Sequence, residues 1–190
     1  MQKILITGAN RGLGLEFTRQ YAAEGWHIIA CCRSPESADE LKTLAAGNSN
    51  IIIEKLDVAD FAAIDQLGIK YKETPIDILL NNAGIIGPIP IDENITRQHF
   101  AQMEYDIWED VMRVNCYAPM KLTETFMDNV AASDQKKIIC ISSSVGSISE
   151  MNIPGVAYAS SKTALNRAMT IAARELKPKG VIVGLFCPGY

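Results

Sequence analysis

Two tyrosines in this sequence are each followed four residues later by a lysine: Tyr158 precedes Lys162, and Tyr117 precedes Lys121. A phenol has an ordinary pKa of about 10, and a nearby ammonium group favours its ionised form. Residues four apart on a helix share one face, so either pair could exchange a proton with a reacting oxygen atom. In a chain with 6 tyrosines the spacing alone is weak evidence, and the neighbouring residues have to distinguish the two pairs.

The surroundings favour the later pair. Pro119 lies between Tyr117 and Lys121, where it removes a backbone donor and tends to kink a helix. Tyr158 follows an apolar run, a cluster of serines and a glycine, a pattern expected beside the crevice where open α/β sheets bind ligands. We therefore interpret Tyr117 and Lys121 as packing and surface charge, and Tyr158 and Lys162 as candidates for chemistry.

A glycine-rich turn, TGANRGLG, follows the first apolar run and precedes a stretch with helical spacing. Gly8, Gly12 and Gly14 would permit a tight turn, close approach of the backbone to a pyrophosphate, and close packing of the helix on the strand. The helix N-terminus would add unpaired N–H donors and a positive dipole. The turn therefore predicts a phosphate-binding loop, and the alternative is an ordinary tight turn.

Short apolar runs rich in Ile, Leu and Val recur along the chain and are typical of buried strands. They span 3–7, 26–32, 50–56, 76–81, 136–142 and 180–186. Stretches with helical spacing separate them, and strands that alternate with helices form right-handed crossovers and a parallel sheet. The sequence therefore predicts an α/β fold in which a doubly wound parallel sheet of six strands lies between two helix layers, a Rossmann-like αβα arrangement.

The longest stretch without periodicity is 84–98, in which Pro88 and Pro90 are expected to block a helix. A helical region is expected to follow and to reach about Val130. A long loop after the carboxyl end of a strand is often functional in such folds. We therefore expect 84–98 to border a ligand site.

Composition narrows the class of protein. The 190 residues are 48% hydrophobic and 21% charged, which is typical of one globular domain spanning 1–190. A formal net charge of -4 gives no basic footprint, so neither nucleic acid nor a membrane is expected as a partner. The 5 cysteines form no CxxC pair and there are 2 histidines, so we expect buried free thiols, no metal site and a reducing, cytoplasmic location.

A series of motifs resembles, in order, those of the short-chain dehydrogenase/reductase superfamily. The turn from Thr7 to Gly14 is similar to the family's cofactor loop, with the spacing TGxxxGxG. It is followed by LDV at 56–58, NNAG at 81–84, VN at 114–115, ISSSVGS at 141–147, YASSK at 158–162 and PG at 188–189. The combination looks most like the small NADPH-dependent carbonyl reductases of the C-factor and sniffer type.

The resemblance implies a catalytic set and a cofactor-binding set. The catalytic set is Asn115, Ser143, Tyr158 and Lys162. The cofactor-binding set is Thr7, Gly8, Asn10, Arg11, Gly12, Leu13, Gly14, Arg33, Asp57, Val58, Asn82, Ala83, Gly84, Tyr158, Lys162, Pro188 and Gly189. Asp57 is implied to contact the adenine. The family's pattern ISSxxG selects Ser143 over its neighbours Ser142 and Ser144.

Each catalytic residue has an implied role in hydride transfer between NADP(H) and a carbonyl or alcohol substrate. The nicotinamide supplies the hydride, and Tyr158 supplies the proton as general acid/base. Ser143 holds the substrate oxygen as a fixed dipole, and Lys162 also reaches the nicotinamide ribose. Asn115 holds a local backbone distortion and a water that relays protons, unless it is an ordinary helix Asn satisfied by its neighbours.

The end of the second apolar run bears on the choice of cofactor. A carboxylate there would bind the adenosine ribose hydroxyls of NAD and repel a 2′-phosphate. Cys32 occupies that position, followed by Arg33, and Arg11 lies in the glycine-rich turn. Two guanidinium groups can form charge-assisted bonds to a phosphate. We therefore expect NADP(H) to be preferred over NAD(H); the alternative is that both arginines are ordinary surface residues.

The resemblance further implies a small-molecule substrate, a homo-oligomer (dimer or tetramer) and further residues after Tyr190, so the domain is expected to be truncated after its sixth strand, with the C-terminal part missing. Ile85, Ile86 and the segment EMNIPG at 150–155 indicate an apolar substrate entrance. The alternative function is a non-catalytic NADP(H)-sensing or binding protein on the same fold, because a fold does not establish turnover. The filled catalytic positions argue against it, and the TGxxxGxG spacing and short chain disfavour an epimerase or dehydratase.

Overall fold

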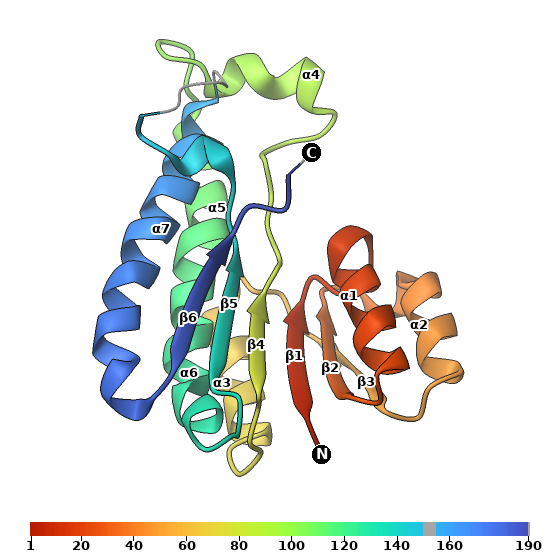
Figure 1. The fold of residues 1–190 in the computed structure, drawn as a ribbon. Coiled ribbons are helices and arrows are strands. Elements are labelled where there is room, and N and C mark those ends of the chain that lie inside the picture. Colours follow the sequence, from red (N-terminus) through yellow and green to blue (C-terminus); the bar gives the residue numbers. More distant parts are fainter. Residues whose placement is uncertain (150–154, 190) are drawn as a thin grey trace.

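Six parallel strands form one sheet (Figure 1). The structure, a computed structural model, describes residues 1–149 and 155–189. The strands are β1 (Lys3–Thr7), β2 (His27–Cys32), β3 (Ile51–Lys55), β4 (Ile78–Asn81), β5 (Lys137–Ile141) and β6 (Ile182–Phe186). Their order is β3-β2-β1-β4-β5-β6, and every neighbouring pair is parallel. The predicted sheet is confirmed, and each strand lies within its expected range.

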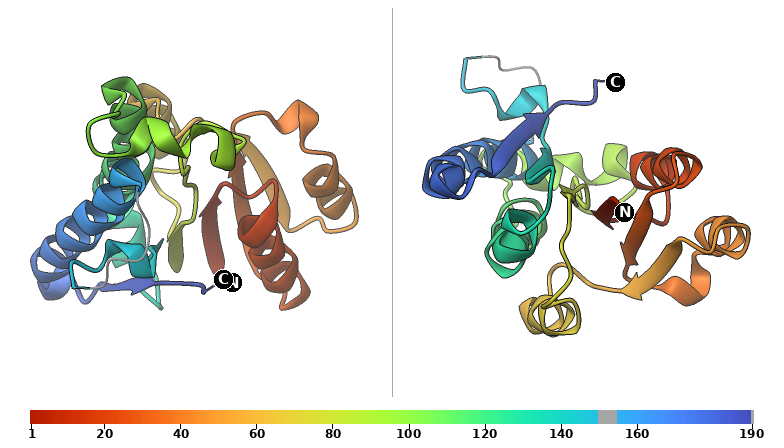
Figure 2. Two further views of the ribbon diagram at one scale, coloured as in Figure 1. Left: turned by 90° about the horizontal axis from the view of Figure 1, so that it is seen from above. Right: turned by 60° about the horizontal axis from the view of Figure 1, so that its bottom comes forward.

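Helices cover both faces of the sheet, so the predicted three layers are confirmed (Figure 2). The main helices are α1 (Gly12–Ala23), α2 (Asp39–Ala46), α3 (Phe61–Lys70), α5 (Tyr105–Met112), α6 (Ala118–Ala131) and α7 (Val156–Leu176). α1 and α2 pack on one face, and α3, α6 and α7 pack on the other. α5 packs against α7. The architecture is doubly wound and Rossmann-like.

Alternate residues of the central strand enter opposite helix layers. Ile4 and Ile6 are buried in the core beneath α1 and α2, whereas Leu5 is buried in the core beneath α3, α6 and α7. Strands covered on both faces need apolar side chains in both directions, which explains the continuous Ile and Leu runs. Burial of each such side chain stabilises the fold by about 1.5–3 kcal/mol. This core holds the strand ends in fixed positions.

The winding of the chain reverses at β1, which pairs with β2 on one side and with β4 on the other. Ile4 of β1 lies opposite both Ile28 of β2 and Ile78 of β4. The chain after β1 enters α1 on one face, and the chain after β4 leads to the helices of the other face. Open α/β sheets bind ligands in the crevice that such a reversal creates at the carboxyl ends of the strands.

The segment 84–98 contains short helical elements, so the expectation that its prolines block a helix is wrong. α4 (Ile91–Asn94) begins directly after Pro90, and a 3₁₀ helix follows at Ile95–Gln98. Proline lacks an N–H, but its fixed φ suits the start of a helix, where that donor has no partner to reach. The proline therefore marks a helix boundary here.

A π-helical turn at Arg113–Tyr117 interrupts the helical region that follows, between α5 and α6. Pro119 lies in the first turn of α6. Because proline has no N–H to donate to the carbonyl four residues earlier, the regular α-helical pattern fails around Asn115. Single π-helical turns are frequent at functional sites, and Asn115 is in the middle of this one.

Two further properties concern the described part of the chain. None of its helices combines the length and the apolar character that a membrane crossing requires.

The cysteines of the described residues are free thiols. Cys31, Cys32, Cys116 and Cys140 are buried and Cys187 is exposed, so the predicted buried thiols are confirmed except at Cys187.

Candidate active site

The predicted site residues gather at one edge of the sheet. Parallel strands present their carboxyl ends together, and the glycine-rich turn, the NNAG segment, the serine cluster and the PG turn directly follow β1, β4, β5 and β6 (Figure 1). The catalytic pair approaches the same edge from the first turns of α7, because the Lys162 side chain bonds to the end of β5. The fold therefore assembles motifs that are far apart in the sequence.

Tyr158 and Lys162 lie one turn apart on α7. The Lys162 Nζ atom is 5.6 Å from the centre of the Tyr158 ring. The same ammonium group donates a 2.9 Å hydrogen bond to the Ile141 carbonyl at the end of β5. The sheet thus anchors a positive charge beside the phenol, an arrangement that favours the phenolate form.

Burial changes the acidity of Lys162, which is 5% exposed. Desolvation lowers the pKa of Lys162 from 10.5 to about 8, and the nearby Cys140 thiol raises it by a smaller amount. A lysine whose pKa lies near neutrality can release and regain a proton under physiological conditions. Lys162 can therefore both stabilise a phenolate and take part in proton exchange.

Ser143 precedes a 3₁₀ helix at Ser144–Gly146, and its Oγ accepts a 3.4 Å hydrogen bond from the Val145 N–H. A hydroxyl that accepts in this way still has its own proton to donate. Ser142 is buried and donates its proton to the Asn166 side chain, with 2.6 Å between the oxygens. Ser143 is thus better placed than Ser142 to donate to a substrate oxygen.

Asn115 is 1% exposed and lies in the π-helical turn. Its side chain connects this turn to the segment after β4 and to α7. Its Oδ1 accepts from the Ile85 N–H at 2.9 Å, and its Nδ2 donates to the Ile85 carbonyl at 2.7 Å. Nδ2 also donates at 3.0 Å to Ser161 Oγ, which lies beside Lys162 in the chain. The motif resemblance selected Asn115 but missed Ser161, because only the fold brings the two together.

The glycine-rich turn needs glycine for both conformation and space. Gly8 and Gly12 have φ of 67° and 55°, in the left-handed region that favours glycine. A Cβ on Gly14 would collide with the Gly8 carbonyl oxygen and would lie 2.6 Å from Asn82 Nδ2. Gly12 and Leu13 are exposed at the start of α1. The close packing and the open helix N-terminus together suit a bound phosphate.

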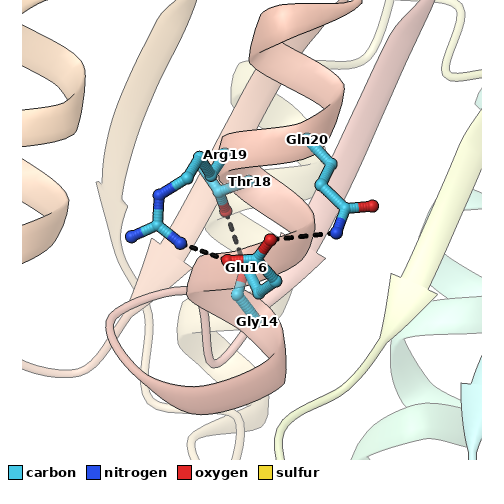
Figure 3. A network of polar contacts seen from close by, with 5 residues as sticks. All are labelled: Gly14, Glu16, Thr18, Arg19 and Gln20. Carbon is cyan, nitrogen blue, oxygen red and sulfur yellow. Dashed lines mark hydrogen bonds and ion pairs between the residues drawn. The ribbon is translucent and has the colours of Figure 1, made fainter.

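Side chains on α1 bond to one another (Figure 3). Glu16 accepts hydrogen bonds from Arg19 and, at 2.9 Å, from Gln20, and the Thr18 hydroxyl donates to the Gly14 carbonyl at 2.8 Å. The hydrogen bond from Gln20 and the charge of Arg19 lower the pKa of the Glu16 carboxyl. Arg19 is thus paired on its own helix, and the capacity of α1 to bind an anion resides in its N-terminus.

Thr7 and Asn82 hold the ends of β1 and β4 together. Thr7 Oγ1 accepts from the N–H groups of Asn82 and Ala83, each at 3.0 Å. Asn82 Nδ2 donates to the Thr7 carbonyl at 2.9 Å, and Thr7 is 1% exposed. Both residues were predicted to bind the cofactor; the structure places them at the carboxyl ends of β1 and β4, where their hydrogen bonds join the two following loops.

Arg11 and Arg33 follow neighbouring strands. The Ala9 N–H donates to the Cys31 carbonyl at 3.0 Å, which extends the pairing of β1 with β2. Each arginine lies two residues beyond this contact and is exposed, whereas Cys32 is 3% exposed. Two guanidinium groups on adjacent loops, with a thiol in place of a carboxylate, suit a 2′-phosphate.

The loop after β3 carries Asp57 and Val58. Asp57 is exposed, and its Oδ1 accepts from the Ala59 N–H at 2.9 Å, whereas Val58 is buried. Arg113 Nε donates to the Ala59 carbonyl at 2.8 Å, and its guanidinium carbon lies 4.5 Å from the centre of the Phe61 ring. The π-helical turn therefore braces this loop, a contact that the sequence did not predict.

The turn after β6 reaches the serine cluster. Gly189 has φ of 84°, in the left-handed region, beside Pro188. Cys187 Sγ accepts from the Ser144 N–H at 3.2 Å, and hydrogen bonds from the backbone of Gly189 and Ser144 lower the pKa of the Cys187 thiol. The predicted apolar entrance is described in part: Ile85 packs against the core between α5 and α7, and 150–154 lie outside the described residues.

Tyr117 and Lys121 have different surroundings from the other pair. Lys121 Nζ lies 2.5 Å from Asp65 Oδ1, and both side chains are partly exposed. Tyr117 is 49% exposed and lines a cavity of about 710 Å³ together with Trp108 and Ser160. The predicted interpretation of Lys121 as a surface charge is confirmed.

The sequence is similar to a known protein family and to curated proteins. Residues 2–190 match the family model described as short chain dehydrogenase. Among curated proteins, (+)-neomenthol dehydrogenase of Arabidopsis thaliana is 34% identical over 160 residues, a match that covers 76% of this chain and 54% of that protein. The chain therefore spans about half the length of this relative.

Solved structures resemble the whole chain. A structure of NADPH-bound carbonyl reductase from chicken fatty liver has a TM-score of 0.88 at 28% identity, covering 100% of this chain and 79% of the other. The carbonyl reductase Sniffer of D. melanogaster has a TM-score of 0.85 at 30% identity, covering 100% of this chain and 81% of the other.

Proposed function

This chain belongs to the short chain dehydrogenase family, and on that premise we propose that it transfers a hydride between NADP(H) and a carbonyl or alcohol substrate, with Tyr158 as general acid/base. The observation that carries the proposal is the buried Lys162 ammonium, anchored on the end of β5 and 5.6 Å from the centre of the Tyr158 ring. A charged lysine is costly to bury, so its presence beside a phenol at the carboxyl ends of the strands supports a chemical role.

Each residue of the site would have a separate role in the reduction of a carbonyl. The nicotinamide, when bound, supplies the hydride. The substrate oxygen would accept a hydrogen bond from Ser143 and the proton from Tyr158. Lys162 would stabilise the phenolate that remains, and Asn115 would keep the π-helical turn and α7 in register. Residues 1–190 would act as a single dinucleotide-binding domain.

The primary test is consumption of NADPH by the protein in the presence of aldehydes, ketones and quinones. Turnover of any of these that depends on Tyr158 supports the proposal. Tight NADPH binding without turnover across the panel would favour the alternative, a non-catalytic NADP(H)-sensing or binding protein.

We also propose that NADP(H) is preferred over NAD(H), because exposed Arg11 and Arg33 flank a position that carries Cys32 instead of a carboxylate. The Arg11→Ala, Arg33→Ala double variant should lose affinity for NADPH but not for NADH, and the preference of the wild type should shrink as salt rises. Arg19→Ala is the matched control, since Arg19 pairs with Glu16. Equal affinities of the wild type for both cofactors would contradict the preference.

We also propose that the protein forms a homo-oligomer and that it acts in a reducing, cytoplasmic compartment. Tyr105 is 69% exposed and stacks on Trp108 beside the 710 Å³ cavity, and exposed aromatic surface of this kind is enriched at protein interfaces. The buried free cysteines fit a reducing environment. Light scattering on the purified protein tests the assembly: a mass of one chain would contradict it.

A further inference from the structure

The loop that carries Ser143 is anchored to α7 by side chains beyond the YASSK motif. Ser142 Oγ donates to Asn166 Oδ1 at 2.6 Å, immediately before Ser143. Asn166 Nδ2 donates to the Gly146 carbonyl at 3.4 Å, and Thr163 Oγ1 donates to the same carbonyl at 3.1 Å. The helix therefore holds the loop on both sides of Ser143.

Gly146 lies so close to α7 that a residue with a Cβ would not fit at this position without a shift. A Cβ there would lie 2.9 Å from Asn166 Nδ2 and 2.9 Å from the carbonyl carbon of Lys162. The loop backbone thus rests directly on the helix, one turn beyond Tyr158. Since Gly146 touches the same helix that carries Tyr158, this contact contributes to the distance between Ser143 and Tyr158.

Hydrogen bonds inside the loop carry the anchor to the Ser143 side chain. The Gly146 N–H donates to the Ser143 carbonyl at 3.0 Å, and the Val145 N–H donates to Ser143 Oγ at 3.4 Å. Fixing Gly146 and Ser142 therefore fixes the short turn between them. The orientation of the Ser143 hydroxyl follows from that turn.

We propose that Asn166 is a positioning residue for Ser143. It contacts both flanks of the serine and belongs to the helix that carries Tyr158 and Lys162, so it keeps the hydroxyl and the phenol directed at one substrate oxygen. The inference rests on the proposed function and extends it. Misplacement of a catalytic group by about 1 Å can cost about 10²-fold in rate, so a side chain that touches no reacting atom can still control turnover.

The first test compares Asn166→Ala with Thr170→Ala. Thr170 lies one turn further along α7, is exposed, and donates to the Asn166 backbone carbonyl at 2.7 Å, so its loss leaves the anchor intact. With NADPH and para-nitrobenzaldehyde as probe substrate, Asn166→Ala should lower kcat about 10- to 100-fold without changing NADPH affinity. Thr170→Ala should match the wild type. An unchanged kcat in Asn166→Ala overturns the proposal.

The second test asks whether Asn166 acts through Ser143. In a Ser143→Ala background the hydroxyl that Asn166 positions is gone, so adding Asn166→Ala should cause little further loss of kcat. A further loss as large as in the wild-type background would mean a general effect on the fold and would overturn the proposal. If Asn166→Ala does not fold, Ser142→Ala removes the same 2.6 Å hydrogen bond from the other end.

The last test does not depend on turnover. Amide hydrogen exchange at Gly146 and Ser147, whose N–H groups bond to Ser143 and Ser144 carbonyls, should become at least several-fold faster in Asn166→Ala and stay unchanged in Thr170→Ala. Unchanged exchange in Asn166→Ala rules out the anchor itself. Faster exchange in a protein whose wild type turns over no carbonyl would instead reject the proposed function and leave the anchor standing.

Discussion

The two tyrosine–lysine pairs have the same spacing and differ in what surrounds the lysine. Lys162 is 5% exposed and donates to the carbonyl at the end of β5, whereas Lys121 is partly exposed and pairs with the Asp65 carboxylate. Helical spacing places each tyrosine and its lysine on one face in both cases. Only Lys162 has its charge held in a desolvated position, where an ammonium acts strongly on a neighbouring phenol.

The difference follows from where each pair lies in the fold. Tyr158 is in the first turn of α7, which starts at the edge where the strands end. Tyr117 closes the π-helical turn and lines the cavity between α5 and α7 with Trp108. Burial of the lysine and position relative to the strand ends therefore distinguish the two pairs, whereas spacing does not.

The largest expected effect separates the two tyrosines. Tyr158→Phe removes the hydroxyl that we propose delivers the proton, so kcat for carbonyl reduction with NADPH should fall about 10²- to 10⁴-fold, with cofactor affinity little changed. Tyr117→Phe should leave kcat within about twofold of the wild type. Comparable losses at both positions would show that the helix around Asn115 contributes more to the site than its contacts indicate.

Substitution of the two lysines should also have different effects, both on turnover and on NADPH affinity. Lys162→Ala should reduce turnover by about 10- to 10³-fold and should also weaken NADPH binding, because its proposed ribose contact is lost. Lys121→Ala should change neither quantity. Fluorescence titration with NADPH and steady-state kinetics check this, and unchanged cofactor affinity in Lys162→Ala would remove the ribose contact from the account.

The third expected effect is the contribution of Lys162 to the pH dependence of the free energy of unfolding. Burial lowers its pKa from 10.5 to about 8, so between these values the unfolded chain binds more protons than the folded one, and stability rises with pH. Below about pH 8 both states are protonated, and the folded state carries the full cost of the buried charge.

Relative to Lys162→Met, the wild type should therefore gain up to roughly 3 kcal/mol in its free energy of unfolding as the pH rises from about 8 to about 10.5. Urea unfolding of both proteins across this range measures the difference. A constant difference would show that the ammonium is not desolvated in the folded protein.

The smallest effect concerns the ion pair of Lys121. Its partner Asp65 is half exposed, and surface pairs of this kind contribute about 0–1 kcal/mol. Asp65→Asn should lower the free energy of unfolding by no more than that, and high salt should abolish the difference. A loss of several kcal/mol would mean that Lys121 is more strongly coupled to the core than its exposure indicates.

The sheet was predictable because its strands are apolar on both faces and local composition reveals them. The segment after β4 was less predictable. Pro90 was expected to block a helix and instead precedes one, since the fixed φ of a proline is compatible with a helix that starts directly after it. A distortion of the helix near Pro119 and Asn115 was expected, but the periodicity does not show that it is a π-helical turn or that Asn115 bonds to Ile85.

The residues of the candidate site could be selected by motif order, but the hydrogen bonds that hold them in place could not. Thr7 bonds to Asn82 across β1 and β4, and Ser142 bonds to Asn166 across the serine loop and α7. These partners are distant in sequence, and neither Thr7 in a strand, Asn82 in a loop nor Asn166 on a helix has a local feature that marks it as a partner. Such contacts become visible only when the strand ends and helix starts are placed together.

We propose that Tyr158 and Lys162 act as one unit whereas Tyr117 and Lys121 do not, and a double-mutant cycle on kcat at saturating NADPH measures this difference. If the lysine acts through the phenol, adding Lys162→Ala to Tyr158→Phe should cost little beyond the loss caused by Tyr158→Phe alone. The matched cycle with Tyr117→Phe and Lys121→Ala should show no coupling. Fully additive losses at Tyr158 and Lys162 would contradict the account.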